Sequence, residues 1–411
     1  MLGLRLRWPL FVPMRIARIL TRLNFGGPAR QVLASDPLLA GRGHQLRLFC
    51  GQPESGEGDL ADQARAAGLE VVSVPGLERA PSAWRDLRAQ AFLRRALRAF
   101  DPDVVHTHAF KAGWLGRTAA KRATPRAARV HTFHGHVLEG YFPEWLSRVL
   151  IGLERRLASQ TDRVLAVSRA TADDLTRLGV VAAEQLRLSP PGIDLKPFLE
   201  QPALPQRNPA GVALRRRWGV PDEACLALVL GRLAQVKRPQ AALDVFAEVA
   251  RERPQLWLVL VGDGPPRKAL HQRLATWPAE LRARVLLAGA MPDAPAVHAA
   301  SDLLLLTSRN EGWPVAVIEA AAAGRAVVAP DVGGLREALT RPERGWLAAA
   351  ADDAALARGL GRLVDDPECS RRLGATARAH ARAMHSAEAL ADRLEAVYSE
   401  ALDERIAKEV A

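Results

Sequence analysis

The chain has 411 residues, of which 48% are hydrophobic and 25% charged, as in globular proteins and unlike disordered or collagen-like chains. A single hydrophobic core rarely extends beyond about 250–300 residues, so this length predicts two domains. The net charge of +12 is uneven, because residues 1–200 hold 29 Lys and Arg against 19 Asp and Glu, whereas residues 201–411 hold 28 against 26. Three widely spaced cysteines exclude a disulfide framework and are what we expect of a cytoplasmic protein.

The first 13 residues contain two arginines and a short apolar run, which together resemble a weak signal peptide. No small-residue cleavage site follows them, and the next apolar stretch is interrupted by Arg18 and Arg22. We therefore interpret residues 1–13 as an N-terminal extension ahead of the first strand.

Short apolar runs alternate with helix-length segments in both halves of the chain. We expect strands at residues 15–23, 46–50, 69–74, 103–107, 129–133 and 163–167 in the first half. The second half has similar runs at residues 226–230, 256–261, 284–287, 302–306 and 326–329. Nearly all-apolar strands separated by helices indicate parallel sheets covered on both faces. The fold class is therefore α/β, with two Rossmann-like, doubly wound domains.

A proline-rich polar stretch at residues 200–211 is the natural linker between the halves. It separates a predicted N-terminal domain (residues 14–199) from a C-terminal domain (212–385). A helical pattern closes the chain at 386–411.

Glycine pairs follow one strand in each half. Gly26 and Gly27 let the backbone approach a ligand and open the next helix with free N–H groups, although two glycines also suit a plain turn. Gly262 and Gly264 follow a strand of the second half, but the third glycine of a dinucleotide fingerprint is missing. That pattern excludes nicotinamide binding.

Two cations in the second half, Arg232 and Lys237, flank a strand-to-helix loop. Two positive side chains and a helix N-terminus are suited to holding a diphosphate. Two basic side chains are also common on a solvated surface, so assigning Arg232 and Lys237 to diphosphate binding requires other suitable groups nearby.

Those groups are two glutamates, Glu311 and Glu319. Glu311 lies in a loop before Gly312, and Glu319 lies inside the helix that Pro314 is suited to open. The start of that helix offers free N–H groups and a positive dipole end to a phosphate. One carboxylate before the helix and one inside it then reach hydroxyls on either side of the phosphate, as a sugar nucleotide requires.

Five of the ten histidines fall within residues 106–136. His106 and His108 share one face of a strand, a spacing that suits zinc, but no nearby carboxylate or thiol pattern completes a ligand set. His134 follows a strand end, where its side chain is expected to face a cleft and to donate to a phosphate or a sugar hydroxyl.

The basic first half indicates an anionic partner: a membrane surface, an acidic acceptor or nucleic acid. An arginine-rich helix at residues 84–100 suits an anionic membrane, although such a stripe more often packs on its own sheet. The alternative is that the total charge reflects genome composition, which explains the asymmetry between the halves less well. No aromatic–basic recognition module is present, so we do not expect nucleic acid as a partner.

Taken together, these motifs resemble those of the retaining glycosyltransferases of family 4. The resemblance covers nearly the whole chain from Met14, and some members with a similar histidine motif act in bacterial surface-polysaccharide synthesis. The residues that carry it are Gly26-Gly27, His131-Thr-Phe-His134, Gly231-Arg-Leu with Lys237, Gly262-Asp-Gly264, and Asn310-Glu-Gly through Glu319 to Gly333-Gly334.

The resemblance implies a GT-B fold, in which two domains face each other across a cleft and the C-terminal helix returns to the N-terminal domain. It also implies that Arg232 and Lys237 bind the donor diphosphate and that Glu319 binds the ribose. Glu311 and His134 would then lie near the transferred sugar. Transfer is expected with retention and without a metal ion or cofactor, from a UDP- or GDP-linked sugar to a glycan or lipid-linked acceptor.

Two departures from the family pattern concern the sugar pocket and a neighbouring strand. Trp313 stands where a smaller or different residue is usual, and Ala326 where proline is common.

Two other functions remain open at this stage. One is an epimerase or phosphorylase of the same fold, and the other is a non-catalytic protein that binds sugar nucleotides.

Overall fold

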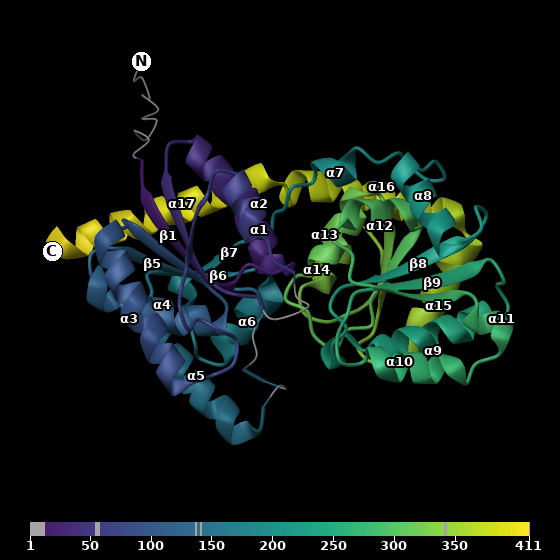
Figure 1. Cartoon of the computed structure of the whole chain (residues 1–411), viewed down its shortest axis with the longest axis horizontal. Helices are drawn as coiled ribbons and strands as arrows, with labels where there is room; N and C mark the ends of the chain where they lie inside the picture. The colour runs from purple at the N-terminus through teal and green to yellow at the C-terminus, as the bar shows by residue number, and fades with distance from the viewer. Residues whose placement is uncertain (1–12, 54–57, 136–137, 140–141, 341–342, 411) are drawn as a thin grey trace, which may run out of the picture.

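The computed structural model describes residues 13–53, 58–135, 138–139, 142–340 and 343–410, and it contains two lobes, each built on a parallel sheet (Figure 1). Most of the N-terminal extension, as well as His136 and Tyr141, lies outside the described residues.

The first sheet has seven strands in the order β3-β2-β1-β4-β5-β6-β7, all paired in parallel. The strands are β1 (Arg15–Arg22), β2 (Gln45–Gly51), β3 (Glu70–Ser73), β4 (Val104–His108), β5 (Ala128–Phe133), β6 (Arg163–Ala166) and β7 (Leu186–Leu188). The strand order reverses direction between β1 and β4, which creates a crevice at the carboxyl ends of these strands.

The second sheet has six strands in the order β10-β9-β8-β11-β12-β13, also parallel. The strands are β8 (Cys225–Leu230), β9 (Leu256–Val261), β10 (Val285–Gly289), β11 (Leu303–Leu305), β12 (Ala326–Pro330) and β13 (Trp346–Ala348). Here the order reverses between β8 and β11.

Helices connect the strands and cover both sheets (Figure 1). In the first lobe they are α1 (Gly27–Gly41), α2 (Ala61–Ala66), α3 (Ala83–Phe100), α4 (Phe110–Ala123), α5 (Glu144–Ala158), α6 (Arg169–Arg177) and the short η1 (Ala183–Gln185). The helices that follow are α7 (Lys196–Leu199), α8 (Pro209–Trp218), η2 (Gln235–Lys237), α9 (Pro239–Ala250), α10 (Arg267–Ala275), α11 (Ala279–Arg282), α12 (Ala294–Ala300), α13 (Val315–Ala322), α14 (Leu335–Leu339), α15 (Asp353–Asp365), α16 (Pro367–Met384) and α17 (Ala387–Val410).

Side-chain alternation along β1 shows why helices cover both faces of the first sheet. Ala17 and Ile19 point to one face and pack with α3 and α4, while Ile16 points to the other and packs with α17. Both sets are fully buried. A strand with apolar residues on both faces requires two layers of helices, as predicted.

All eleven predicted strands are present, with ends within two residues of those expected. The predicted α/β class and the two Rossmann-like domains are confirmed. Two strands were not predicted: β7 and β13, each of three residues and each at the edge of its sheet.

The C-terminal helix α17 lies along the first lobe, as predicted (yellow in Figure 1). Its Leu390, Leu394 and Tyr398 are buried against the first sheet. The chain crosses between the lobes earlier than residue 200, because Ile193 and Phe198 already pack in the core of the second lobe. The end of the predicted linker is also helical, since α8 begins at Pro209.

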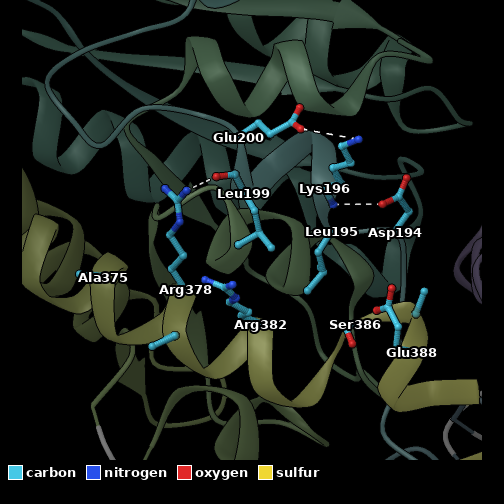
Figure 2. Close-up of a pocket in the computed structure, with 12 residues that line it drawn as sticks. Asp194, Leu195, Lys196, Leu199, Glu200, Ala375, Arg378, Arg382, Ser386 and Glu388 are labelled. Carbon is cyan, nitrogen blue, oxygen red and sulfur yellow. Dashed lines mark hydrogen bonds and ion pairs between the residues drawn. The ribbon is translucent and has the colours of Figure 1, made fainter. Parts of the chain in front are cut away.

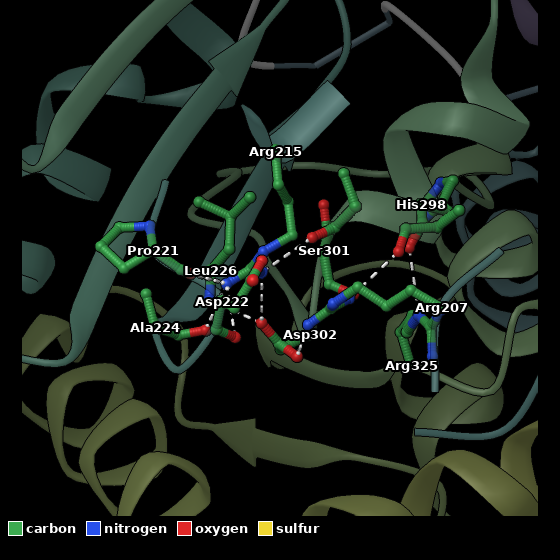
Figure 3. Close-up of polar contacts among 12 residues, drawn as sticks. Arg207, Arg215, Pro221, Asp222, Ala224, Leu226, His298, Ser301, Asp302 and Arg325 are labelled. Atoms are coloured by element: carbon green, nitrogen blue, oxygen red, sulfur yellow. Dashed lines mark hydrogen bonds and ion pairs between the residues drawn. The ribbon is translucent and has the colours of Figure 1, made fainter. Parts of the chain in front are cut away.

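A buried ionic network ties α8 to the second sheet (Figure 3). Asp302, just before β11, accepts hydrogen bonds from Arg207, from Arg215 (3.2 Å) and from the Leu226 backbone N–H (2.8 Å). Burial lowers the pKa of Arg215, which is 1% exposed. Arg215 also donates to the carbonyl oxygens of Ala224 and Ala300, so the guanidinium is held from several sides.

Replacing Asp302 with alanine is expected to lower the free energy of unfolding by about 3–5 kcal/mol, because the change leaves a buried guanidinium without its carboxylate. Urea denaturation measures the loss. The control is Asp244→Ala, which breaks the exposed ion pair with Arg273 and is expected to cost less than about 1 kcal/mol. Equal losses of unfolding free energy in the two variants would contradict the role of Asp302 as the carboxylate partner of a buried guanidinium.

Candidate functional site

Loops at the carboxyl ends of β8 and β9 support each other by close backbone packing. A Cβ atom on Gly262 would lie 1.9 Å from the carbonyl oxygen of Gly231, and one on Gly264 would lie 1.9 Å from that of Leu233. Both glycines also have positive φ angles, 147° and 154°. Their observed role is therefore to position the loop that carries Arg232.

The two predicted cations differ in their surroundings. Lys237 ends η2, and its Nζ lies 2.5 Å from Oε1 of Glu311. Arg232 is exposed on the preceding loop and makes no hydrogen bond or ion pair with the part of the chain that the structure describes. Lys237 is thus fixed in the site, whereas Arg232 extends into solvent.

Glu311 is almost fully buried at the end of the loop that follows β11. Besides Lys237, its Oε1 accepts a hydrogen bond from Ser308 Oγ at 2.6 Å. The backbone around it is also packed, because a Cβ on Gly333 would lie 1.7 Å from the Glu311 carbonyl oxygen. The carboxylate therefore has one fixed orientation, set by a cation and a hydroxyl.

Glu319 lies just over one turn into α13, which begins at Val315 with Pro314 as its N-cap. The helix start is where the sequence predicted it, with Pro314 at its N-cap. Its carboxylate pairs with Arg30 of α1, in the other lobe, and lies 3.5 Å from His298 Nε2. The ion pair crosses between the lobes.

Gly26 and Gly27 bring the first lobe into contact with α13. Gly26 is the N-cap of α1, and Gly27 is its first residue. A Cβ on Gly27 would lie 3.0 Å from Cγ2 of Val315, so the starts of α1 and α13 touch. Both helix N-termini, with their positive dipole ends, therefore meet at the boundary between the lobes.

His134 follows β5, as predicted, and both of its ring nitrogens have partners. Nε2 lies 2.9 Å from Nδ1 of His108, and Nδ1 lies 3.4 Å from the amide nitrogen of Gln31. Burial, with a contribution from Arg18, lowers the pKa of His134 to about 3, so the ring is neutral at pH 7. A hydrogen bond from His134 to a ligand would require one of these contacts to be exchanged.

A cavity of about 290 Å³ lies between the lobes and brings together four of the predicted residues. His134 lies on one side, and Lys237, Glu311 and Gly312 lie on the other. Gly312 touches the first lobe, since a Cβ there would lie 2.2 Å from the His134 carbonyl oxygen. The described residues that line it are Ala109, Phe110, Phe133, His134, Gly135, Leu138, Val236, Lys237, Asn310, Glu311 and Gly312.

The other predicted site residues are not among the residues that line this cavity. They are Gly26, Gly27, Arg232, Gly262, Gly264 and Glu319.

A larger cavity of about 700 Å³ lies where the chain crosses between the lobes, between α7 and the α16–α17 junction (Figure 2). None of the predicted site residues lines it, so the smaller cavity is the candidate site.

Four site residues were not predicted from the sequence: Arg30, Gln31, His108 as a partner of His134, and Ser308. Ser308 had a local signal, because a hydroxyl three residues before Glu311 is within reach of its carboxylate in a turn. Arg30 and Gln31 had none, since their contacts depend on how two distant segments meet.

Within the described residues, no set of three His, Cys, Asp or Glu side chains is arranged to hold a metal ion. None of the described helices combines the length and the apolar character needed to cross a bilayer.

The buried histidines predict a pH-dependent stability. Burial lowers the pKa values of His106, His108, His131 and His134 below the value of about 6.5 expected in an unfolded chain. The unfolded state therefore binds more protons below pH 6.5, and stability is lost as the pH falls through that value. Each such group contributes up to about 1.4 kcal/mol per pH unit. Urea midpoints are expected to fall steeply between pH 6.5 and 5.

A His108→Gln variant tests the source of this dependence and is expected to show a shallower fall. The control is His271→Gln, on the exposed surface of α10, which should leave the pH dependence unchanged. Identical urea midpoints at pH 7.5 and 5 in the wild type would contradict the prediction.

Comparison with known proteins gives consistent matches for both lobes. The family model Glycosyltransferase Family 4 matches residues 25–197, and Glycosyl transferases group 1 matches residues 213–380. The D-inositol 3-phosphate glycosyltransferase of Xylanimonas cellulosilytica is 32% identical over 406 residues, which cover 93% of this chain and 94% of that protein.

Solved structures show the same fold. Anabaena Alr3699/HepE in complex with UDP-glucose matches with a TM-score of 0.76 and 22% identity, over 95% of this chain and 100% of that one. WaaG, a glycosyltransferase involved in lipopolysaccharide biosynthesis, matches with a TM-score of 0.71 and 18% identity, over 93% of this chain and 99% of that one.

Two Rossmann-like lobes that share a cavity, matched in both halves by glycosyltransferase models, define a glycosyltransferase of the GT-B fold. The chain belongs to glycosyltransferase family 4, as its 32% identity over nearly its whole length to a named member shows.

Proposed function

We propose that this enzyme transfers a hexosyl group from a UDP- or GDP-linked sugar to a hydroxyl of a glycan acceptor, with retention and without a metal ion. The observation that carries the proposal is the cavity between the lobes, where the Lys237–Glu311 pair faces His134. The Anabaena protein is described in complexes with UDP and with UDP-glucose, which favours UDP as the first nucleotide to test.

In the proposed reaction, the bond between the anomeric carbon and the β-phosphate oxygen breaks, and the diphosphate gains negative charge. Lys237, Arg232 and the N-terminus of α13 are suited to stabilise that charge. Lys237 and Ser308 both engage Oε1 of Glu311, so we assign this carboxylate the role of holding Lys237 in place and not that of a covalent nucleophile. The acceptor oxygen therefore attacks from the face that the diphosphate leaves, and the acceptor proton passes to a phosphate oxygen.

The first-lobe wall of the cavity, as far as the structure describes it, favours an uncharged acceptor over an inositol phosphate, the substrate named for the relatives. The first-lobe residues described in its lining are neutral, and they include Ala109, Phe110 and Leu138. The neighbouring cation Lys111 is buried and paired with Asp86 at 2.6 Å. An acceptor phosphate would lack a counter-charge on these walls, so we propose a glycan hydroxyl, free or lipid-linked, as the acceptor.

Thermal-shift measurements with a panel of sugar nucleotides test the donor assignment, since a ligand that binds only the native state raises its melting temperature. We expect one UDP- or GDP-linked hexose to stabilise the enzyme. Stabilisation by none would contradict the proposal.

The same donor, incubated alone and then with acceptors, tests the reaction. We expect slow hydrolysis without an acceptor and faster transfer to neutral glycans than to inositol 3-phosphate. Conversion of the donor to an epimer would favour an epimerase instead, and binding without turnover would favour a non-catalytic protein. Anomeric analysis of the product tests retention, and unchanged rates in chelator test metal independence.

We also propose that the enzyme acts in the cytoplasm at an anionic membrane surface. The apolar stripe of α3 packs on its sheet, but Trp84 and Leu87 in its first turns are 79% and 60% exposed. On α5, Trp145 and Val149 are 67% and 59% exposed. These apolar side chains lie beside exposed arginines on the same helices, a combination that suits a bilayer interface.

Co-sedimentation with vesicles tests this surface. We expect binding to anionic vesicles that weakens with salt, and weaker binding after Trp84→Ser and Trp145→Ser together. Equal binding to neutral vesicles would contradict the proposal.

A further inference from the structure

The ion pair between Arg30 and Glu319 joins the two lobes next to the candidate site. Arg30 lies in the first turn of α1, and Glu319 lies in α13. The Glu319 side chain is 3% exposed and the Arg30 side chain 27%, so the guanidinium is the solvent-facing part of the pair. The second oxygen of Glu319 faces the buried ring of His298. A ligand that reaches Glu319 from the cleft therefore meets Arg30 first.

Arg30 also stands where positive charge accumulates. The starts of α1 and α13 touch through Gly27 and Val315, so the positive dipole ends of both helices meet within one helical turn of Arg30. Among the described residues, Glu319 is the acidic side chain that Arg30 contacts. If another ligand occupied Glu319, this partly buried cation would need a new anion, because an unpaired buried charge is costly.

We infer that Arg30 is a donor-binding residue that exchanges the Glu319 carboxylate for the donor diphosphate. The inference rests on the proposed function and on the role that the family resemblance implies for Glu319, which is to accept hydrogen bonds from the ribose hydroxyls. A diphosphate supplies the replacement anion, and the planar guanidinium matches phosphate oxygens in a bidentate geometry. The first lobe thereby contributes a cation to a donor site that the sequence assigned mainly to the second lobe.

The exchange has opposite consequences for two ligands. A nucleoside without phosphates displaces Arg30 from Glu319 and leaves the guanidinium without an anionic partner. A nucleoside diphosphate displaces it and provides a stronger partner. Removing Arg30 should therefore weaken diphosphate binding while leaving nucleoside binding unchanged or tighter.

Titration calorimetry of the full-length enzyme with uridine and UDP, and in parallel with guanosine and GDP, tests this inference. In Arg30→Gln, we expect the Kd for the diphosphate that binds the wild type to rise about tenfold, as for the loss of one charge-assisted contact. The Kd for the matching nucleoside should stay the same or fall. Arg30→Lys, which keeps the charge but not the fork, should recover part of the diphosphate affinity.

The control is Arg42→Gln at the other end of α1, where the arginine pairs with Asp392 and Glu395. It should bind both ligands as the wild type does. Equal weakening of nucleoside and diphosphate in Arg30→Gln would overturn the inference and leave Arg30 as a structural bridge, and so would unchanged diphosphate binding. If the wild type binds neither UDP nor GDP, the proposed function itself fails, and the inference fails with it.

Discussion

Replacing Lys237 with alanine is expected to lower kcat/KM for sugar transfer by about 100- to 1,000-fold, the usual cost of removing one preorganised group that stabilises developing charge. The ammonium lines the cavity between the lobes and is fixed by the carboxylate of Glu311 at 2.5 Å. A cation held in place before the reaction needs no reorganisation when the diphosphate departs. Initial rates with the donor found by thermal shift measure the effect.

Part of that loss reflects Glu311, which would keep Ser308 but lose its cation. Combining Lys237→Ala with Glu311→Gln separates the two contributions, because a cation that acts only through Glu311 adds little to the loss in the double variant. Lys268→Ala, at an exposed position on α10, controls for the loss of one positive charge. Near-normal transfer by folded Lys237→Ala enzyme would refute the role assigned to Lys237.

The secondary structure of this chain was largely predictable because its strands are buried on both faces. Runs such as residues 226–230 and 256–261 are almost entirely apolar, and a central parallel strand has no polar face. The edge strands β7 and β13 have one paired side and three residues each. Three residues are too few to show the periodicity that distinguishes a strand from a loop.

The site was predictable where chemistry follows directly from a strand end. Glu311 and His134 lie in loops after strands, and Lys237 ends the short helix η2 that follows β8. The carboxyl ends of parallel strands gather at one edge of each sheet. Arg30 could not be distinguished from the other Lys and Arg residues, 57 in all, because nothing in the sequence around it indicates that α1 meets α13. Gly26 and Gly27 were recognised as close-approach positions, but the nearest atoms to them belong to the side chains of Asn24 and Val315.

The closeness of the two lobes predicts a large effect from one methyl group. A Cβ on Gly312 would lie 2.2 Å from the His134 carbonyl oxygen, whereas real Cβ contacts begin beyond 3.0 Å. Gly312 cannot retreat within its own lobe, since its carbonyl oxygen accepts a hydrogen bond from the Gly334 N–H at 3.1 Å. Gly312→Ala should therefore hold the lobes apart and displace the first-lobe wall from Lys237 and Glu311.

We expect Gly312→Ala to lower kcat/KM by about 100-fold or more, because displacements of about 1 Å are enough to cost that much. Each lobe keeps its own core, so the melting temperature should change little, and small-angle scattering should show a larger radius of gyration. The control is Gly152→Ala in α5, where an added Cβ meets nothing within 4 Å. Wild-type turnover with an unchanged radius of gyration would show that the lobes need not touch at Gly312. Loss of turnover with unchanged dimensions would instead place the damage within the helix start at α13.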